Sequence, residues 1–183
     1  MNDLVLSKLG LLACTLAIST PSFLNFKELL ELSIIKEMEP TSKLVKVVRI
    51  LQSDTLATYM RFIKSNPDVF EGDAGILQFI LETARISDSK MRVFTFAQFA
   101  NVYIGCYLSY SQIALQLDIH IDDVEMWVMH AVFANVAHVK INQIEQIVLV
   151  KWVLLREFGR SDWGDLEVKC ESLAASLKNN ESK

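Results

Sequence analysis

The sequence predicts a mainly α-helical protein with a short β-hairpin in its second half. Apolar residues recur at helical spacing along most of the 183 residues, and only six glycines and three prolines interrupt them. The period changes to two from Val136 onward. Residues 136–141 and 146–150 are runs rich in β-branched side chains on either side of a polar turn, which is the signal of a hairpin.

Two short helices are predicted directly before this hairpin. The polar run 109–111 precedes an apolar set that ends at Leu117, as expected of a helix with a hydroxyl cap. Asp122 and Asp123 offer a cap for the second helix, with Glu125 close to the spacing of a capping box. The apolar residues of this helix share one face: Val124, Trp127, Val128, Ala131 and Val132. Helix, helix and hairpin in this order are the pattern of a winged-helix module.

Upstream, the spacing predicts consecutive helices joined by short turns. We expect helices over residues 4–18 and 23–32, a third after the break at Pro40, and a fourth capped by Ser53 and Asp54. A fifth is expected to begin at residues 71–73 and a sixth at residues 87–89. Helices of this length suggest right-handed α-helical repeats, an inference from length because the sequence shows no clean repeat period.

The predicted elements divide the chain into three parts. Residues 1–104 form the helical-repeat part, residues 105–160 the winged-helix subdomain, and residues 161–183 a C-terminal helix with a polar tail. The last helix is expected to begin after Ser161 and Asp162, and its apolar residues include Leu166, Leu173 and Leu177.

The composition indicates buried surface and gives no electrostatic reason to expect nucleic acid. Hydrophobic residues make up 51% of the chain, so partner interfaces are expected in addition to a core. The formal net charge is −4. The uncharged stretch 9–26 resembles a membrane span, but its polar residues favour a buried helix, and no membrane association is expected. Three scattered cysteines indicate free thiols in a reducing compartment, which agrees with a cytoplasmic protein.

Specific DNA binding is disfavoured by the charge of the winged-helix segment itself. The predicted second helix, which would enter the major groove, contains no Lys or Arg and opens with three carboxylates. Residues 108–158 hold six acidic side chains against three basic ones, a net charge of −3. Because phosphate contacts dominate the affinity for duplex DNA, protein binding is the better interpretation of this module. A winged-helix nucleic-acid-binding protein stays open as an alternative.

An enzymatic function finds little support. The three histidines, His120, His130 and His138, fall on a turn, a helix and a strand without metal-ligand spacing. The sequence lacks the phosphate-binding, nucleophile-elbow and zinc-protease motifs. We therefore predict no catalytic residues, no metal site and no cofactor.

Several of these residues resemble the PCI domain, the shared scaffold of the proteasome lid, the COP9 signalosome and translation initiation factor 3. The run 108–110 followed by Ile113 and Leu117 is similar to the family's entry to its winged helix. Residues 122–125 resemble its D-D-V-E pattern, and residues 139–143 resemble its K-I-D-Q signature, with Asn142 where the family usually has Asp. The resemblance covers about residues 20–178.

Within this family, the segment after the hairpin distinguishes between relatives. Arg156-x-Phe158-Gly159 followed by Trp163-x-x-Leu166 is similar to the subunit m family of eukaryotic translation initiation factor 3, and less similar to subunit 7 of the COP9 signalosome. Lys90-Met91-Arg92 with Phe94 agrees with the same family. Its members are longer, so the chain is expected to correspond to their C-terminal half, as a fragment or a diverged short form.

The resemblance implies a non-catalytic scaffold subunit of initiation factor 3, which supports assembly of initiation complexes on the 40S ribosomal subunit. A signalosome subunit 7-like scaffold is the alternative within the family. The implied partners are other PCI and MPN subunits of a multisubunit complex, and indirectly the 40S subunit. The predicted contacts are edge pairing of wing strands and burial of apolar faces. The residues expected at these contacts are Val136, Val139, Ile147, Leu149, Trp152, Leu166, Leu173 and Leu177.

Overall fold

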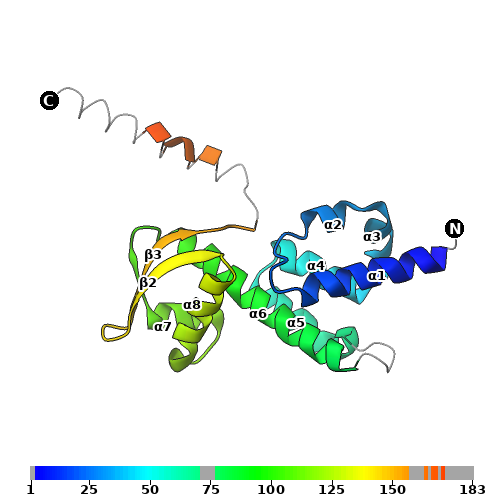
Figure 1. The fold of residues 1–183 in the computed structure, drawn as a ribbon, viewed down its shortest axis with the longest axis horizontal. Helices are drawn as coiled ribbons and strands as arrows, with labels where there is room; N and C mark the ends of the chain where they lie inside the picture. Colours follow the sequence, from blue (N-terminus) through cyan, green and yellow to red (C-terminus); the bar gives the residue numbers. More distant parts are fainter. Residues whose placement is uncertain (1–2, 71–76, 157–162, 165, 169, 172–183) are drawn as a thin grey trace.

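A computed structural model of the chain describes residues 3–70, 77–156, 163–164, 166–168 and 170–171. Helices α1 to α5 form one end of the molecule and the winged helix forms the other, with the long helix α6 running through both (Figure 1). The structure confirms the predicted class, which is helical repeats followed by a winged helix. The predicted C-terminal helix falls largely outside the described residues.

The first five helices begin and end where caps and breaks place them. Helix α1 covers Asp3–Ser19, and the short helices α2 (Lys27–Glu31) and α3 (Ser33–Met38) replace the single helix expected over residues 23–32. Ser42 caps α4 (Lys43–Ser53) by accepting a hydrogen bond from the Val45 amide. Thr55, and not Ser53 or Asp54, caps α5 (Leu56–Ser65). A 3-10 turn, η1 (Pro67–Phe70), follows.

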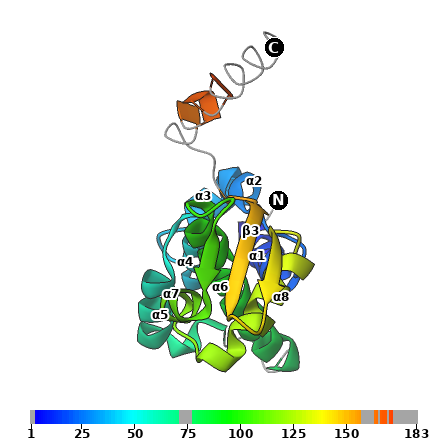
Figure 2. The same cartoon turned by 90° about the vertical axis from the view of Figure 1, so that its left-hand side faces the viewer.

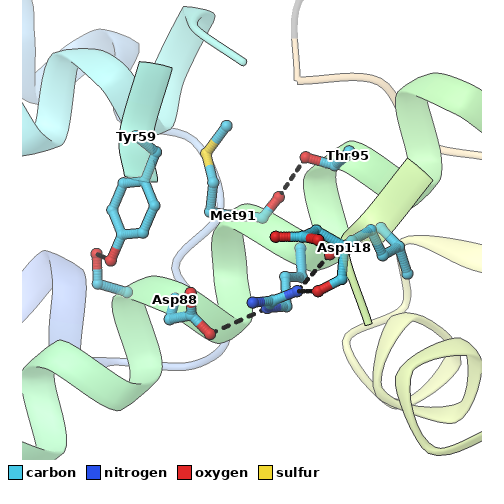
Figure 3. Close-up of polar contacts among 8 residues, drawn as sticks. Tyr59, Asp88, Met91, Thr95 and Asp118 are labelled. Carbon is cyan, nitrogen blue, oxygen red and sulfur yellow. Dashed lines mark hydrogen bonds and ion pairs between the residues drawn. The ribbon is translucent and has the colours of Figure 1, made fainter. Parts of the chain in front are cut away.

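Helix α6 (Leu77–Asn101) is continuous through residues 87–89, so the prediction of a new helix there was wrong. The polar side chains that resemble a cap have other partners. The Tyr59 hydroxyl donates to the Ser87 hydroxyl at 3.0 Å, and Asp88 accepts from Arg92 one turn further along the helix (Figure 3). A serine and an aspartate satisfied in this way stay in a helix interior, because they no longer compete for its backbone groups.

The winged helix contains three strands, one more than the sequence predicted. Strand β1 (Tyr107–Ser109) precedes α7 (Tyr110–Leu117), the 3-10 turn η2 (Ile121–Asp123) and α8 (Val124–Phe133). Strands β2 (Ala137–Asn142) and β3 (Ile147–Val153) form the wing. The sheet is antiparallel in the order β1-β3-β2, and β3 and β2 lie side by side in Figure 2.

Two hydrophobic cores meet along α6. One core lies among α1, α4 and α5 and takes Met91 and Phe94 from α6. The other lies among α7, α8 and the sheet and takes Val93, Phe96 and Ala97 from the same helix. Because neighbouring α6 side chains enter different cores, the helical part and the winged helix are packed as one unit through this helix.

Candidate protein-interaction surface of the winged helix

In the part of the chain that the structure describes, the outer edge of β2 presents backbone groups that no other strand pairs. The Val150 amide donates to Cys106 O and its carbonyl accepts from Gly105, so Val150 faces β1. Peptide groups alternate in direction along an antiparallel strand, so Val148 faces β1 while Ile147 and Leu149 face β2. These two residues oppose Asn142 and Lys140.

On β2 the same alternation directs the backbone N–H and C=O groups of Val139 and Ile141 away from β3. Their backbone amides and carbonyls therefore point outward, and within the described residues no backbone hydrogen bond reaches them from another element. An unpaired strand edge of this kind is a template for adding a strand from another chain.

The structure distributes the predicted contact residues over different environments. Val136 is 1% exposed and belongs to the core, so its side chain faces α8 and the sheet interior. Val139, Ile147 and Leu149 are half-buried on the wing strands. Trp152 is 43% exposed, with its ring 6.3 Å from that of His138.

On the last predicted helix, Leu166 is exposed, whereas Leu173 and Leu177 lie outside the described residues. The wing therefore offers Trp152 and the outer edge of β2 at its surface, together with Ile144 in its turn, which is 96% exposed.

Glu125 fixes the wing to the helices beneath it. The Tyr110 hydroxyl donates to Glu125 Oε1 at 2.8 Å, and the side-chain amide of Gln143 donates through Nε2 to Glu125 Oε2 at 2.5 Å. Burial and the neighbouring carboxylate raise the pKa of Tyr110 to about 12. Glu125 therefore does not complete the capping box that its spacing suggested. It joins the start of α7, the start of α8 and the tip of the wing.

The turn of the wing keeps its side-chain hydrogen bond despite Asn142. Asn142 Oδ1 accepts from the Glu145 amide at 3.3 Å, as an aspartate oxygen would. Gln146 completes the turn with a φ of 53°. Asn142 thus supplies the oxygen acceptor that this turn uses.

Arg92 joins α6 to both helices of the winged helix. Its guanidinium donates to the carbonyls of Leu117 and Asp118 at the C-terminal end of α7 (Figure 3). It also pairs with Asp88 at 3.1 Å and lies over the Trp127 ring of α8. A cation at a helix C-terminus is favoured because it faces the negative end of the helix dipole.

Two further cations bind backbone carbonyls of the helical part. Lys90 Nζ donates to Ala17 O, in the last turn of α1, and to Phe23 O, both at 2.8 Å. Burial lowers the pKa of Lys90 to about 8. Arg156 donates to Leu51 O at 2.7 Å, in the last turn of α4.

Each of these two cations also lies against an aromatic ring. Lys90 lies over Phe26 and Arg156 over Phe94, as Arg92 does over Trp127. The residues that carried the family resemblance, Lys90, Arg92, Phe94 and Arg156, therefore position helices relative to α6. Arg92 joins α6 to the winged helix and Arg156 joins the segment after β3 to α4, whereas Lys90 joins α6 to the end of α1.

The second helix of the winged helix has the surface of a protein-binding element. Asp122 and Asp123 are exposed at its start, and the His120 ring accepts from the Asp122 amide there. Met126, Met129 and Phe133 follow along its exposed side. Carboxylates at this end oppose phosphate, whereas a stripe of methionines and an aromatic ring suits another protein.

The histidines lie apart, on three different elements. Across the described ranges, no group of three or more His, Cys, Asp or Glu side chains is arranged to hold a metal ion. No helix of the described part of the chain is both long and apolar enough to cross a membrane.

Sequence reasoning missed one feature of this surface. The outward direction of the Val139 and Ile141 peptide groups depends on the register of β3 against β1, and the three-residue strand β1 is too short to be recognised from its sequence. On α8, Phe133 is 77% exposed, in agreement with the interpretation of this helix as a protein-binding element.

Comparison with known proteins places these features in a family. Residues 68–152 match the profile of the PCI domain. The chain is 30% identical over 173 residues to eukaryotic translation initiation factor 3 subunit M of Coccidioides immitis, 29% identical to that of Aspergillus fumigatus and 28% identical to that of Phaeosphaeria nodorum. These matches cover 93–94% of the chain and 36–37% of the relatives. The chain thus spans about a third of the length of the curated relatives it matches.

The profile match begins in η1 and ends in β3, so it contains α6, with Lys90 and Arg92, and nearly the whole winged helix. The match to subunit M continues through the helices upstream. From the fold, from the residues that fix it and from this match, we conclude that the chain contains a PCI domain.

Proposed function

We propose that the chain is a non-catalytic scaffold subunit of a eukaryotic translation initiation factor 3 complex. The similarity to subunit M over more than nine-tenths of the chain supports this, because that name assigns those relatives to the complex. The partners would be the complex's other PCI and MPN subunits, and indirectly the 40S ribosomal subunit, in the cytoplasm.

The observation that carries the mechanism is the unpaired edge of β2. A strand from a neighbouring subunit would hydrogen-bond to the outward peptide groups of Val139 and Ile141 and extend the sheet across the two chains. The proposed side-chain contacts are those of Val139, Ile147, Leu149 and Trp152 around this edge, and those of Leu166, Leu173 and Leu177 on the last helix. The core position of Val136 supports the strand from within.

The cations along α6 support a scaffold role in a second way. A subunit in an extended assembly must hold its two ends at a fixed angle, and an interface gains affinity when its parts are already ordered. Lys90 and Arg92 on α6 bind carbonyls at the ends of α1 and α7, and Arg156, after β3, binds a carbonyl in the last turn of α4 and lies over Phe94 of α6. We propose that these ties orient the wing toward the next subunit.

Affinity purification of the tagged full chain followed by mass spectrometry tests the proposal. We expect co-purification of initiation factor 3 subunits and co-sedimentation with 40S particles. Recovery of cullin-regulating signalosome subunits instead would move the chain to the alternative assembly. Salt-sensitive binding of the purified chain to duplex DNA or structured RNA, without subunit partners, would favour the nucleic-acid-binding alternative.

A further inference from the structure

A cleft of about 670 Å³ opens at the junction between the helical part and the winged helix. Its walls come from the loop after α1, the middle of α6, the C-terminal end of α8 and the residue that follows β3. Apolar side chains dominate it, including Leu24, Ile86 and Val93. Phe133 and Leu154 line it as well and are more than half exposed. The cleft is thus an apolar groove with two large side chains left open to solvent.

The charge of this cleft differs from that of the chain around it. Among the described residues, the titratable side chains that line it are Lys90 and His130, and neither is a carboxylate. The chain as a whole carries a net charge of −4, and the winged-helix segment carries −3. The cleft is therefore a place where an acidic group would meet positive charge and no repelling carboxylate.

The positive charge of the cleft is located at Lys90 Nζ. The residue is 4% exposed, and two carbonyl oxygens accept from its ammonium group. Among the described residues, no carboxylate lies within 4.0 Å of Nζ. A buried ammonium has three N–H donors and is stabilised by a carboxylate more strongly than by carbonyls alone. A carboxylate that enters the cleft would supply the missing counter-charge.

The apolar surface continues from the cleft along α8. Met126, Met129 and Phe133 follow one another at spacings of three and four residues, so they share one face of the helix, and all three are exposed. Seven residues of helix span roughly 10 Å. Phe133 belongs to both the cleft and this stripe, and an apolar surface along a helix face is of the kind that an amphipathic peptide segment covers.

We propose that the cleft and the α8 stripe form a docking site for an amphipathic segment of a partner protein, in which a carboxylate between bulky apolar side chains reaches Lys90. Phe133 and Leu154 would pack on either side of this segment. The wing edge lies on β2, so this surface would bind a second partner segment without competing for that strand. The inference does not depend on which complex contains the chain.

Selection from a phage-displayed library of random peptides tests the proposal on the full chain. Phe133→Ser serves as the counter-selection target, since an exposed side chain can be replaced without loss of the core. We expect enriched peptides that share an Asp or Glu between bulky apolar residues. Synthetic versions with that acid changed to its amide should bind about tenfold more weakly. The matched control is Leu115→Ser on α7, which removes an exposed leucine outside the cleft and should leave binding unchanged.

A second readout addresses Lys90 without mutating it. The ¹³Cε chemical shift of Lys90 gives its pKa, and a bound acidic peptide should raise that pKa above the value of about 8 found in the free chain. Three outcomes overturn the proposal: no enriched peptides, peptides without an acid, or equal binding to the Phe133→Ser chain.

Two experiments distinguish a partner segment from two other possible occupants of the cleft. If the chain's own C-terminal segment fills the cleft, Phe133→Cys will form an intramolecular disulfide with Cys170 when oxidised glutathione is added as the oxidant. If a second copy fills it, sedimentation will show a dimer that Phe133→Ser dissociates. Either result would replace the partner segment with that occupant. Both experiments use the chain alone, so their failure is separate from failure to join an initiation factor complex.

Discussion

The guanidinium of Arg92 lies 5.3 Å from the centre of the Trp127 ring. This contact joins α6 to α8 at the place where the two hydrophobic cores adjoin. The same guanidinium donates to two carbonyls at the end of α7. One side chain thus fixes both helices of the winged helix against the helix that carries the rest of the chain.

Replacing Arg92 with methionine is expected to lower the free energy of unfolding by about 2–3 kcal/mol, because two carbonyls lose a charged donor and the ring contact is lost. Arg85→Met, an exposed position on the same helix, should change it by less than about 0.5 kcal/mol. Urea denaturation measures both. Equal effects of the two substitutions would show that Arg92 does not fix the junction.

The pKa of Lys90 should be about 8 in the folded chain, against an ordinary value of 10.5, because burial disfavours the charged form. Between these two values the unfolded chain binds more protons than the folded chain. The contribution of Lys90 to the free energy of unfolding therefore rises with pH across that window and is lowest below it. A ¹³Cε titration of the folded chain measures the pKa. A value at 10.5 would contradict the burial of this ammonium.

Glu125→Gln is expected to lower the pKa of Tyr110 from about 12 toward its ordinary value of 10, because the carboxylate charge disfavours the tyrosinate. Part of the increase should remain, since burial of the ring is its larger cause. A ¹³Cζ titration of the tyrosines measures it, with Asp123→Asn, a nearby exposed carboxylate, as control. No change in Glu125→Gln would remove the link between the wing tip and α7.

Asn142→Asp should leave stability nearly unchanged, because either side chain offers an oxygen to the Glu145 amide. Asn142→Ala should lower the free energy of unfolding by up to about 1 kcal/mol. The comparison is made by urea denaturation of the three chains. If aspartate proves as costly as alanine, the turn depends on the amide group and not on an oxygen acceptor.

Local patterns predicted the winged helix well. The hydroxyl cap at Ser109 forms, and it is part of a capping box with Gln112. The two wing strands begin and end within a few residues of their predicted bounds, because β-branched side chains are concentrated there. Strand β1 was missed since three residues carry no periodicity, and it exists because β3 offers it a partner edge.

The sequence could not predict which tertiary hydrogen bonds the polar side chains form. Ser87 and Asp88 have the composition of a cap, yet Tyr59 and Arg92 satisfy them and α6 continues. Lys90 and Arg156 bind carbonyls 67 or more residues away, which no local pattern reveals. Val139 on β2 was predicted as a contact residue, but the outward direction of its peptide group and of that of Ile141 required the register of three strands.

The most direct measurement compares Ile141→Pro with Ile141→Ala in cells that express the tagged chain. Proline removes the outward amide of β2 and leaves the bonds of Lys140 and Asn142 to β3, whereas alanine keeps that amide. With both variants shown to be folded, quantitative mass spectrometry of co-purified initiation factor 3 subunits is expected to fall several-fold for proline and to stay near wild type for alanine. Undiminished recovery by the folded proline variant would contradict assembly through the edge of β2.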